Sequence, residues 1–420
     1  FRTPLVWTLT WLFLNLSHFV SAQQSNGSAD PVQPGAILSK GVELARKKGL
    51  EKAYRTFQEA EDYWQVNAAS LLYLHIIADV NNKVLKKKVA TEIFKALYEA
   101  SDAKPKKGLK RIDKLLKKNK HYFPLYLVKG DILTNLDQTE EAESVFAAAI
   151  EEAPDAPLPH LLRGRFHAKL GANQQAIDDF SQAVAMDSSL AIGFFERGFL
   201  LCVEKKYDDA IRDFEIASKS YPDWGQSAIV NEAFFGRGVG RIQRKLYRKA
   251  LADFDRAIAI NPNYVRSYFN RGLAYKGLKS YAKAIEDFDA CIAHNDQFKD
   301  AYYQRASTNL DRGRTSKAVP DLVKVLELDP RDKKSYLKLA ESYYKLRKYN
   351  AAIQQLDKLI ELDATYFWAY YRKGYACKDS GKRRQAIAAF QKFLSVVPKK
   401  YYKQIAHAEV EIKKLKSGMR

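Results

Sequence analysis

The stretch VRSYFNRGLAYKGLKSYAKAIEDFDACIAHNDQF, residues 265–298, decides the fold of this 420-residue chain. Apolar residues recur in it at helical spacing over residues 268–278 and again over residues 281–292. Gly277 and Ser280 lie between the two runs, where a turn is expected. The stretch therefore predicts two helices joined by a short connection.

One such helix pair buries too little apolar surface to be stable alone, and the chain supplies further copies. The first helix of each copy carries a small residue: Gly130, Gly164, Gly198, Gly238, Gly272, Ala306, Ala340 and Gly374. The second helix carries a large apolar residue 16 positions later: Phe146, Phe180, Phe214, Phe254, Phe288, Leu322, Leu356 and Phe390. Successive copies are 34 residues apart, except that six extra residues around Trp224 lengthen one step to 40.

This pattern resembles that of the tetratricopeptide repeat family, and residues 253–262, DFDRAIAINP, closely match the second helix of its motif. The resemblance implies an all-α fold, a right-handed superhelical α-solenoid of helix pairs whose first helices line a concave groove. It covers residues 123–398 as eight repeats and extends more loosely back to about residue 36. The seventh repeat departs from the motif, with Leu359 and Ala364 where alanine and proline are expected.

The remaining segments have other patterns. Residues 1–22 read as a signal peptide, because an apolar run follows Arg2 and small residues precede Gln23. Residues 23–35 read as a flexible tether, residues 36–122 as degenerate, basic helical repeats whose pairing stays open over 66–120, and residues 399–420 as a capping helix. We therefore expect export to a bacterial periplasm or to the outside of the cell. An uncleaved membrane anchor and a eukaryotic secretory pathway are the alternatives.

Large side chains at motif positions five and nine face the groove in the family, so we predict that they contact a protein or peptide partner. These residues are Phe195, Phe199, Phe235, Phe269, Leu273, Tyr303, Tyr371 and Tyr375. Aromatic side chains bury a large area at a low entropy cost, which suits them to binding apolar groups of a partner. The alternative is that these side chains only contact the neighbouring helix.

The net charge of +21 favours an anionic partner or surface, and its basic excess is densest over residues 83–120. Ten residues there are candidates for contact with an anionic polymer or a membrane surface: Lys86, Lys87, Lys88, Lys106, Lys107, Lys110, Arg111, Lys114, Lys117 and Lys118. The alternative is a solvated face that keeps the chain soluble. Arginine is scarce and aromatic residues are not interleaved with the lysines, so sequence-specific nucleic-acid binding is not expected.

The sequence contains no metalloprotease, phosphate-loop or hydrolase nucleophile motif. Its three cysteines have no metal-ligand spacing and read as buried packing residues, and its seven histidines read as surface or packing residues. We therefore predict a non-catalytic scaffold, with no cofactor and no metal, that binds a peptide or protein segment in its groove. The alternative function is an envelope protein that binds a cell-wall polymer, a polysaccharide or a membrane through its basic N-terminal helices.

Overall fold

The structure is a computed structural model that describes residues 34–417, except for residues 48, 62 and 102–103. The predicted signal peptide, 1–22, and residues 23–33 of the predicted tether lie outside the described residues. The first described helix, α2 (Pro34–Arg46), already includes the last two residues of that tether. Proline is favourable in the first turn of a helix, because the N–H that it lacks would have no partner there.

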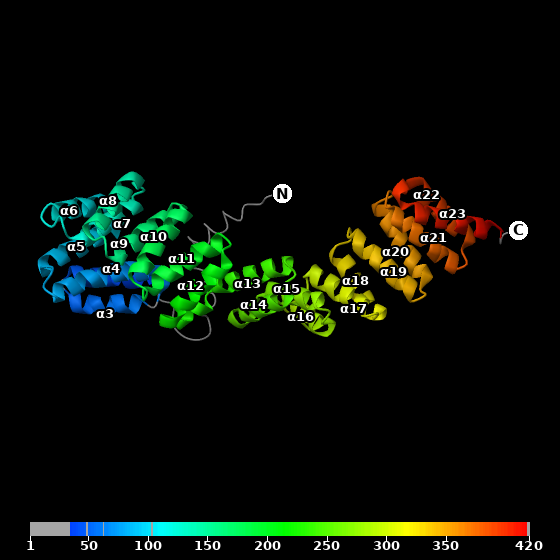
Figure 1. The fold of residues 1–420 in the computed structure, drawn as a ribbon, viewed down its shortest axis with the longest axis horizontal. Coiled ribbons are helices and arrows are strands. Elements are labelled where there is room, and N and C mark those ends of the chain that lie inside the picture. Colours follow the sequence, from blue (N-terminus) through cyan, green and yellow to red (C-terminus); the bar gives the residue numbers. More distant parts are fainter. Residues whose placement is uncertain (1–33, 48, 62, 102–103, 418–420) are drawn as a thin grey trace. The chain divides into compact units, whose positions relative to one another are not determined.

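In the described residues all regular secondary structure is helical, and from residue 123 onward the helices form consecutive pairs (Figure 1). The pairs are α7 (Phe123–Asn135) with α8 (Thr139–Glu152), α9 (Pro157–Lys169) with α10 (Asn173–Met186), α11 (Ala191–Val203) with α12 (Tyr207–Ser220), α13 (Ala228–Gln243) with α14 (Tyr247–Ile260), α15 (Val265–Gly277) with α16 (Tyr281–His294), α17 (Lys299–Asp311) with α18 (Thr315–Leu328), α19 (Lys333–Lys345) with α20 (Tyr349–Leu362), and α21 (Phe367–Asp379) with α22 (Arg383–Val396). The helix-pair fold predicted from the sequence is confirmed.

The two helices of a pair meet where a small residue faces a large one. A Cβ atom added to Gly238 would lie 2.7 Å from the ring of Phe254, which is fully buried and has no room to move. The ring therefore requires glycine on the facing helix. Where leucine replaces phenylalanine on the second helix, the first helix carries alanine instead: Ala306 with Leu322 and Ala340 with Leu356.

The described chain divides into two compact units, which we call the first unit (up to Val230) and the second unit (from Asn231). The six-residue insertion lies near the end of the first unit and forms a 3-10 helix, η1 (Pro222–Gln226). Its Trp224 is buried and stacks on Tyr221 with 4.2 Å between ring centroids. The insertion is thus a folded part of the first unit.

One helix of the first unit, α4 (Trp64–Asn81), belongs to no pair. On either side of it, α2 pairs with α3 (Leu50–Ala60), and α5 (Lys87–Ser101) pairs with α6 (Pro105–Leu116). Helix α4 contacts α3, and it also contacts α9 and α11, which follow much later in the chain. The sequence left the pairing of this region open, and the structure resolves it.

Apolar residues are distributed around most of helix α4, which suits it to contacts with several neighbouring helices. Leu72, Tyr73, Ile76 and Ile77 are buried, and no residue from 71 to 80 is fully exposed. The Tyr122 hydroxyl, just before α7, donates a hydrogen bond of 2.7 Å to Asp79 near the end of α4. Helix α4 is therefore part of the core of the first unit.

The chain ends, in its described part, with η2 (Lys399–Tyr401) and α23 (Tyr402–Ser417). Ala408 and Leu415 of α23 are buried in a core that includes Phe390 of α22. Tyr402, the first residue of this helix, is 67% exposed. Its neighbour Tyr401 packs on Phe367, with 5.0 Å between ring centroids.

Candidate partner-binding site

Three of the predicted groove residues, Phe195, Phe199 and Phe235, are at most 6% exposed, so the prediction that their side chains face a partner is wrong. The ring of Phe195 packs against Phe214 of its own helix pair at 5.2 Å between centroids. Phe235 packs in the same way against Phe254, at 6.1 Å. The alternative considered from the sequence, contact with a neighbouring helix, describes these residues.

Four other predicted groove residues are half-buried: Phe269, Leu273, Tyr303 and Tyr375. The ring of Phe269 lies 5.0 Å from that of Phe298, so much of its surface is used within the chain. Tyr303 keeps an accessible face, over which Lys338 Nζ lies 5.8 Å from the ring centroid. Contact of these four with a partner stays a prediction.

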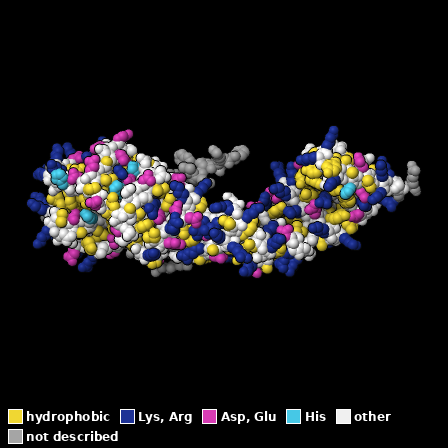
Figure 2. All heavy atoms as spheres, viewed as in Figure 1, with side chains coloured by type: hydrophobic (Ala, Val, Ile, Leu, Met, Phe, Trp, Pro, Cys, Tyr) yellow, Lys and Arg dark blue, Asp and Glu magenta, His cyan; other side chains and the backbone are white. Residues whose placement is uncertain are grey.

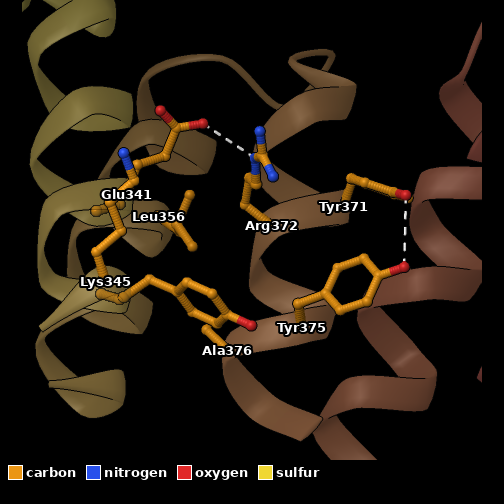
Figure 3. A pocket seen from close by; sticks show the side chains of 10 residues that line it. Glu341, Lys345, Leu356, Tyr371, Arg372, Tyr375 and Ala376 are labelled. Carbon is orange, nitrogen blue, oxygen red and sulfur yellow. Dashed lines mark hydrogen bonds and ion pairs between the residues drawn. The ribbon is translucent and has the colours of Figure 1, made fainter. Parts of the chain in front are cut away.

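A cavity of about 440 Å³ opens between α19 and α21 of the second unit (Figure 3). Tyrosines of these two helices line it, namely Tyr344, Tyr371 and Tyr375. Tyr371 is 8% exposed and Tyr375 is half-buried, and both were predicted as groove residues. Tyr344 was missed, although it occupies motif position twelve, which also faces the groove in the family.

The tyrosine hydroxyl groups at this cavity form hydrogen bonds with other side chains of the protein. The Tyr371 and Tyr375 hydroxyl oxygens lie 3.4 Å apart, and the Tyr344 hydroxyl donates to Asp379 (Figure 3 shows the first contact). Burial raises the pKa of Tyr344 to about 12, and the hydrogen bond to Asp379 adds to this shift. Burial also raises the pKa of Tyr375. Tyr344 and Tyr375 therefore keep their protons at neutral pH.

Charged side chains surround the mouth of the cavity. Arg372 Nε lies 3.0 Å from Glu341 Oε1, so these two charges neutralise each other (Figure 3). Lys378 forms an ion pair of 2.7 Å with Glu411 of α23. Lys345 is exposed and has no carboxylate within ion-pairing distance in the described part of the chain. The mouth therefore carries an unneutralised positive charge.

A second polar cluster lies on the neighbouring first helices α15 and α17. Lys276 Nζ donates to Ser307 Oγ at 3.0 Å and to Gln304 Oε1 at 3.3 Å, and Asp311 lies 3.5 Å away. Burial lowers the pKa of Lys276, against the opposing effect of Asp311. The first helices of the second unit thus present tyrosine, lysine and hydroxyl groups along one surface.

The first helices of the first unit are covered instead. Helix α4 contacts both α9 and α11. From Ala191 to Cys202, every residue of α11 except Arg197 is buried. The surface that corresponds to the open face of the second unit is therefore occupied by a helix of the same chain.

The predicted anion-contact residues lie on α5 and α6 and in the segments next to them, where Lys and Arg side chains gather at one edge of the view in Figure 2. All nine lysines among them are exposed. Arg111 does not belong with them, because its guanidinium forms ion pairs with Glu92 and Glu99 of α5. Its side chain is committed to joining α5 and α6, which the sequence spacing did not indicate.

Four models of the tetratricopeptide repeat match the chain, over residues 127–191, 240–302, 309–376 and 369–400. The chain belongs to the tetratricopeptide repeat family. This membership makes it a protein-interaction scaffold in the broad sense, as the helix-pair resemblance implied.

Two curated proteins are similar to this tetratricopeptide repeat chain. The DnaJ homolog subfamily C member 7 homolog of Dictyostelium discoideum is 22% identical over 249 residues, which are 54% of this chain and 46% of that protein. The DnaJ homolog subfamily C member 3 of Mus musculus is 29% identical over 97 residues, 23% of this chain and 19% of that protein. The match therefore spans less than half the length of either relative.

Several solved structures share helix-pair segments with this tetratricopeptide repeat protein. The C-terminal part of a TPR repeat-containing protein from Cytophaga hutchinsonii covers 58% of this chain and 98% of its own, at 20% identity and a TM-score of 0.44. A MamA protein covers 41% of this chain and 94% of its own, at 22% identity and a TM-score of 0.39. YrrB, described as a TPR protein with an unusual peptide-binding site, covers 45% of this chain and 95% of its own. Its sequence identity is 22% and its TM-score is 0.36.

The described part of this tetratricopeptide repeat protein has no helix that is long and apolar enough to span a membrane. Nor does it bring together three or more His, Cys, Asp or Glu side chains in a way that could hold a metal ion. Cys202, Cys291 and Cys377 are buried and form no disulfide bond in the part of the chain that the structure describes, and burial raises the pKa of Cys291 to about 12.

Proposed function

We propose that the protein is a non-catalytic scaffold that binds a segment of a partner protein on the first helices of its second unit. The observation that carries this proposal is the tyrosine-lined cavity of about 440 Å³ between α19 and α21. Its volume lies within the range of about 300–1,000 Å³ that is common for ligand pockets. Tyrosine is enriched where protein surfaces meet, because its ring buries a large area while its hydroxyl keeps a hydrogen bond.

A difference between the two units supports placing the partner on the second unit. In the first unit α4 lies against α9 and α11, so a partner would have to displace a buried apolar helix. In the second unit every substantial contact joins helices that are one or two places apart in chain order. A partner segment can therefore reach the first helices of the second unit without displacing another helix.

The experiment is photocrosslinking in the cells that make the protein, with a photoreactive amino acid in place of Lys345 at the mouth of the cavity. The matched control carries the same amino acid in place of Lys358, an exposed lysine of the second helix α20. We expect discrete crosslinked proteins from position 345 that are absent from position 358. The same products from both positions, or none from either, would overturn the proposal.

A second candidate function is binding of an anionic polymer or membrane surface by the exposed lysines on and around α5 and α6. It is favoured by the exposure of nine lysines, of which Lys107 forms an ion pair with Glu99, at 3.1 Å. Each basic residue near an anionic membrane adds about 1 kcal/mol of attraction. Vesicles with anionic lipid should sediment the protein at low salt and release it at physiological salt. Equal sedimentation with purely zwitterionic vesicles would contradict this function.

We also propose that the chain is exported, which rests on the apolar run and small residues of segment 1–22 alone. Fusion of this segment to a phosphatase that is active only outside the cytoplasm tests the proposal. Activity that persists when charged residues interrupt the apolar run would refute it.

A further inference from the structure

The interior of the cavity between α19 and α21 is apolar. Its deepest residues are small or aliphatic and almost completely buried: Ala340, Ala352, Leu356 and Ala376. The rings of Tyr371 and Tyr375 form part of its walls (Figure 3), and Tyr344 also lines it. Water gains few hydrogen bonds against such a surface, so an apolar group is the favoured occupant.

The hydroxyl groups of the walls add a directed polar contact. Each hydroxyl has one proton, and the Tyr344 proton is used by Asp379. The Tyr371 and Tyr375 hydroxyls lie 3.4 Å apart, so one of them donates to the other and one proton remains for a ligand. The available group at this wall is therefore a donor.

The charges at the mouth of the cavity favour an anionic ligand. Every carboxylate near the cavity already has a donor: Glu341 has Arg372, Asp379 has Tyr344, and Glu411 has Lys378. Lys345 has no ion-paired carboxylate in the described residues. A cationic ligand would find no free acid, whereas an anionic ligand would find the charge of Lys345 and a phenol donor.

We propose that the cavity binds an acidic stretch of a partner chain, with one large apolar side chain inserted between the tyrosines and a flanking Asp or Glu at Lys345. This inference rests on the proposed function and specifies its ligand. It uses side-chain carboxylates within a continuous segment and requires no free chain terminus. The apolar anchor supplies affinity through burial, and the carboxylate selects the partner through its charge.

The probes are three fluorescent peptides with blocked termini and the sequences GSGELEGSG, GSGKLKGSG and GSGEAEGSG, titrated into the full chain and followed by polarisation. We expect the first to bind about tenfold more tightly than the third, which lacks the anchor. It should also bind several-fold more tightly than the second, whose lysines face Lys345. Equal affinity of the first and third would overturn the anchor, and equal affinity of the first and second would overturn the choice of charge.

Two variants test the location without disturbing the core. Lys345→Gln should weaken the acidic peptide about three- to fivefold, the size of one exposed charge contact, and leave the lysine peptide no weaker. Lys358→Gln on α20 is the matched control and should change neither. Equal effects of the two variants would overturn the location.

The outcomes also separate this inference from the function on which it rests. If crosslinks from position 345 persist but none of the three peptides binds, the ligand chemistry is wrong and the scaffold function stands. If the crosslinks are absent as well, both fall. If phenylacetate competes at the peptide's own affinity, the cavity is a site for small aromatic acids and the inference is overturned.

Discussion

Arg197 of α11 and Asp213 of α12 form a bidentate ion pair, in which Arg197 Nε and Nη2 each lie 2.8 Å from a carboxylate oxygen. The same pairing, 16 residues apart, recurs in four other pairs: Arg163 with Asp179, Arg237 with Asp253, Arg271 with Asp287, and Arg305 with Asp321. All five aspartates are at most 5% exposed. Each of these helix pairs therefore buries a carboxylate that an arginine of the first helix neutralises, and Asp253 has a second arginine, Arg241, at 2.6 Å.

Replacing Arg197 by methionine should destabilise the first unit by about 3 kcal/mol, because it leaves the buried carboxylate of Asp213 without its partner. Urea unfolding measures this loss. The control is Arg212→Met, which breaks an exposed pair with Asp209 and should change the free energy of unfolding by less than about 0.5 kcal/mol. Similar losses in both variants would show that burial of Asp213 is not the cause.

The loss in Arg197→Met should depend on pH. Burial raises the pKa of Asp213, and the hydrogen bonds from Arg197 lower it again, so the pKa rises further in the variant. An acid whose pKa is raised by folding is destabilising when ionised, and the cost is relieved as the pH falls through the folded pKa. The difference from wild type should therefore be smaller at about pH 5 than at about pH 8. An unchanged difference would refute this account.

Gly238→Ala should destabilise the second unit by about 1–3 kcal/mol, since the new methyl group would lie 2.7 Å from the fully buried ring of Phe254. Gly240, two residues later on α13, has no atom within 4 Å of its Cβ position. Gly240→Ala should stabilise the helix by about 0.5–1 kcal/mol. Thermal unfolding of the two variants checks the opposite signs.

A thiol should react slowly on the covered face and rapidly on the open one. Leu161 of α9 and Leu337 of α19 both occupy motif position five, but Leu161 is 0% exposed and Leu337 is half-exposed. We expect maleimide to label Leu337→Cys at least about a hundredfold faster than Leu161→Cys, because labelling of a buried thiol needs local opening. The native cysteines are buried and should give little background. Equal rates would contradict the difference between the two units.

Asp179→Asn should cost about 3 kcal/mol at neutral pH, because Asp179 is buried and shared by three donors. Arg163 and His167 contact it at 2.7 and 2.9 Å, and His160 at 3.4 Å. Burial opposes ionisation, but the bonds from His160 and Arg163 outweigh it and lower the pKa of Asp179. A lowered pKa gives stability that is present above the ordinary pKa of an aspartate and is lost as the pH falls through the folded value.

The gap between wild type and Asp179→Asn should therefore shrink below about pH 4. The matched control is Asp178→Asn, because Asp178 is exposed and bonds only to Gln174 among the contacts seen here. It should unfold like wild type at both pH values. If the difference in free energy of unfolding between wild type and Asp179→Asn stays constant with pH, the charge of Asp179 is not the cause of the stability loss.

The sequence predicted the helix pairs well because the same packing contact repeats in them, a phenylalanine ring of the second helix against a glycine of the first. It also contained a signal for the buried ion pairs, since Arg and Asp recur 16 residues apart in five helix pairs, but this spacing was not used to predict them. The burial of Phe195 could not be predicted, because the same motif position is half-exposed at Leu337 in another pair. Helix α4 carries no motif spacing, and its place depends on helices far along the chain.

Helix α4 has a consequence for the order in which the protein is made. In a simple repeat array each pair packs on the one before it, so folding can follow synthesis step by step. Residues 64–81 leave the ribosome well before α9 and α11, their later contacts, exist. At synthesis rates of about 5–20 residues per second, this apolar helix waits several seconds for the surface that α9 and α11 provide. The first unit therefore closes only when α11 is complete, and it forms as one block.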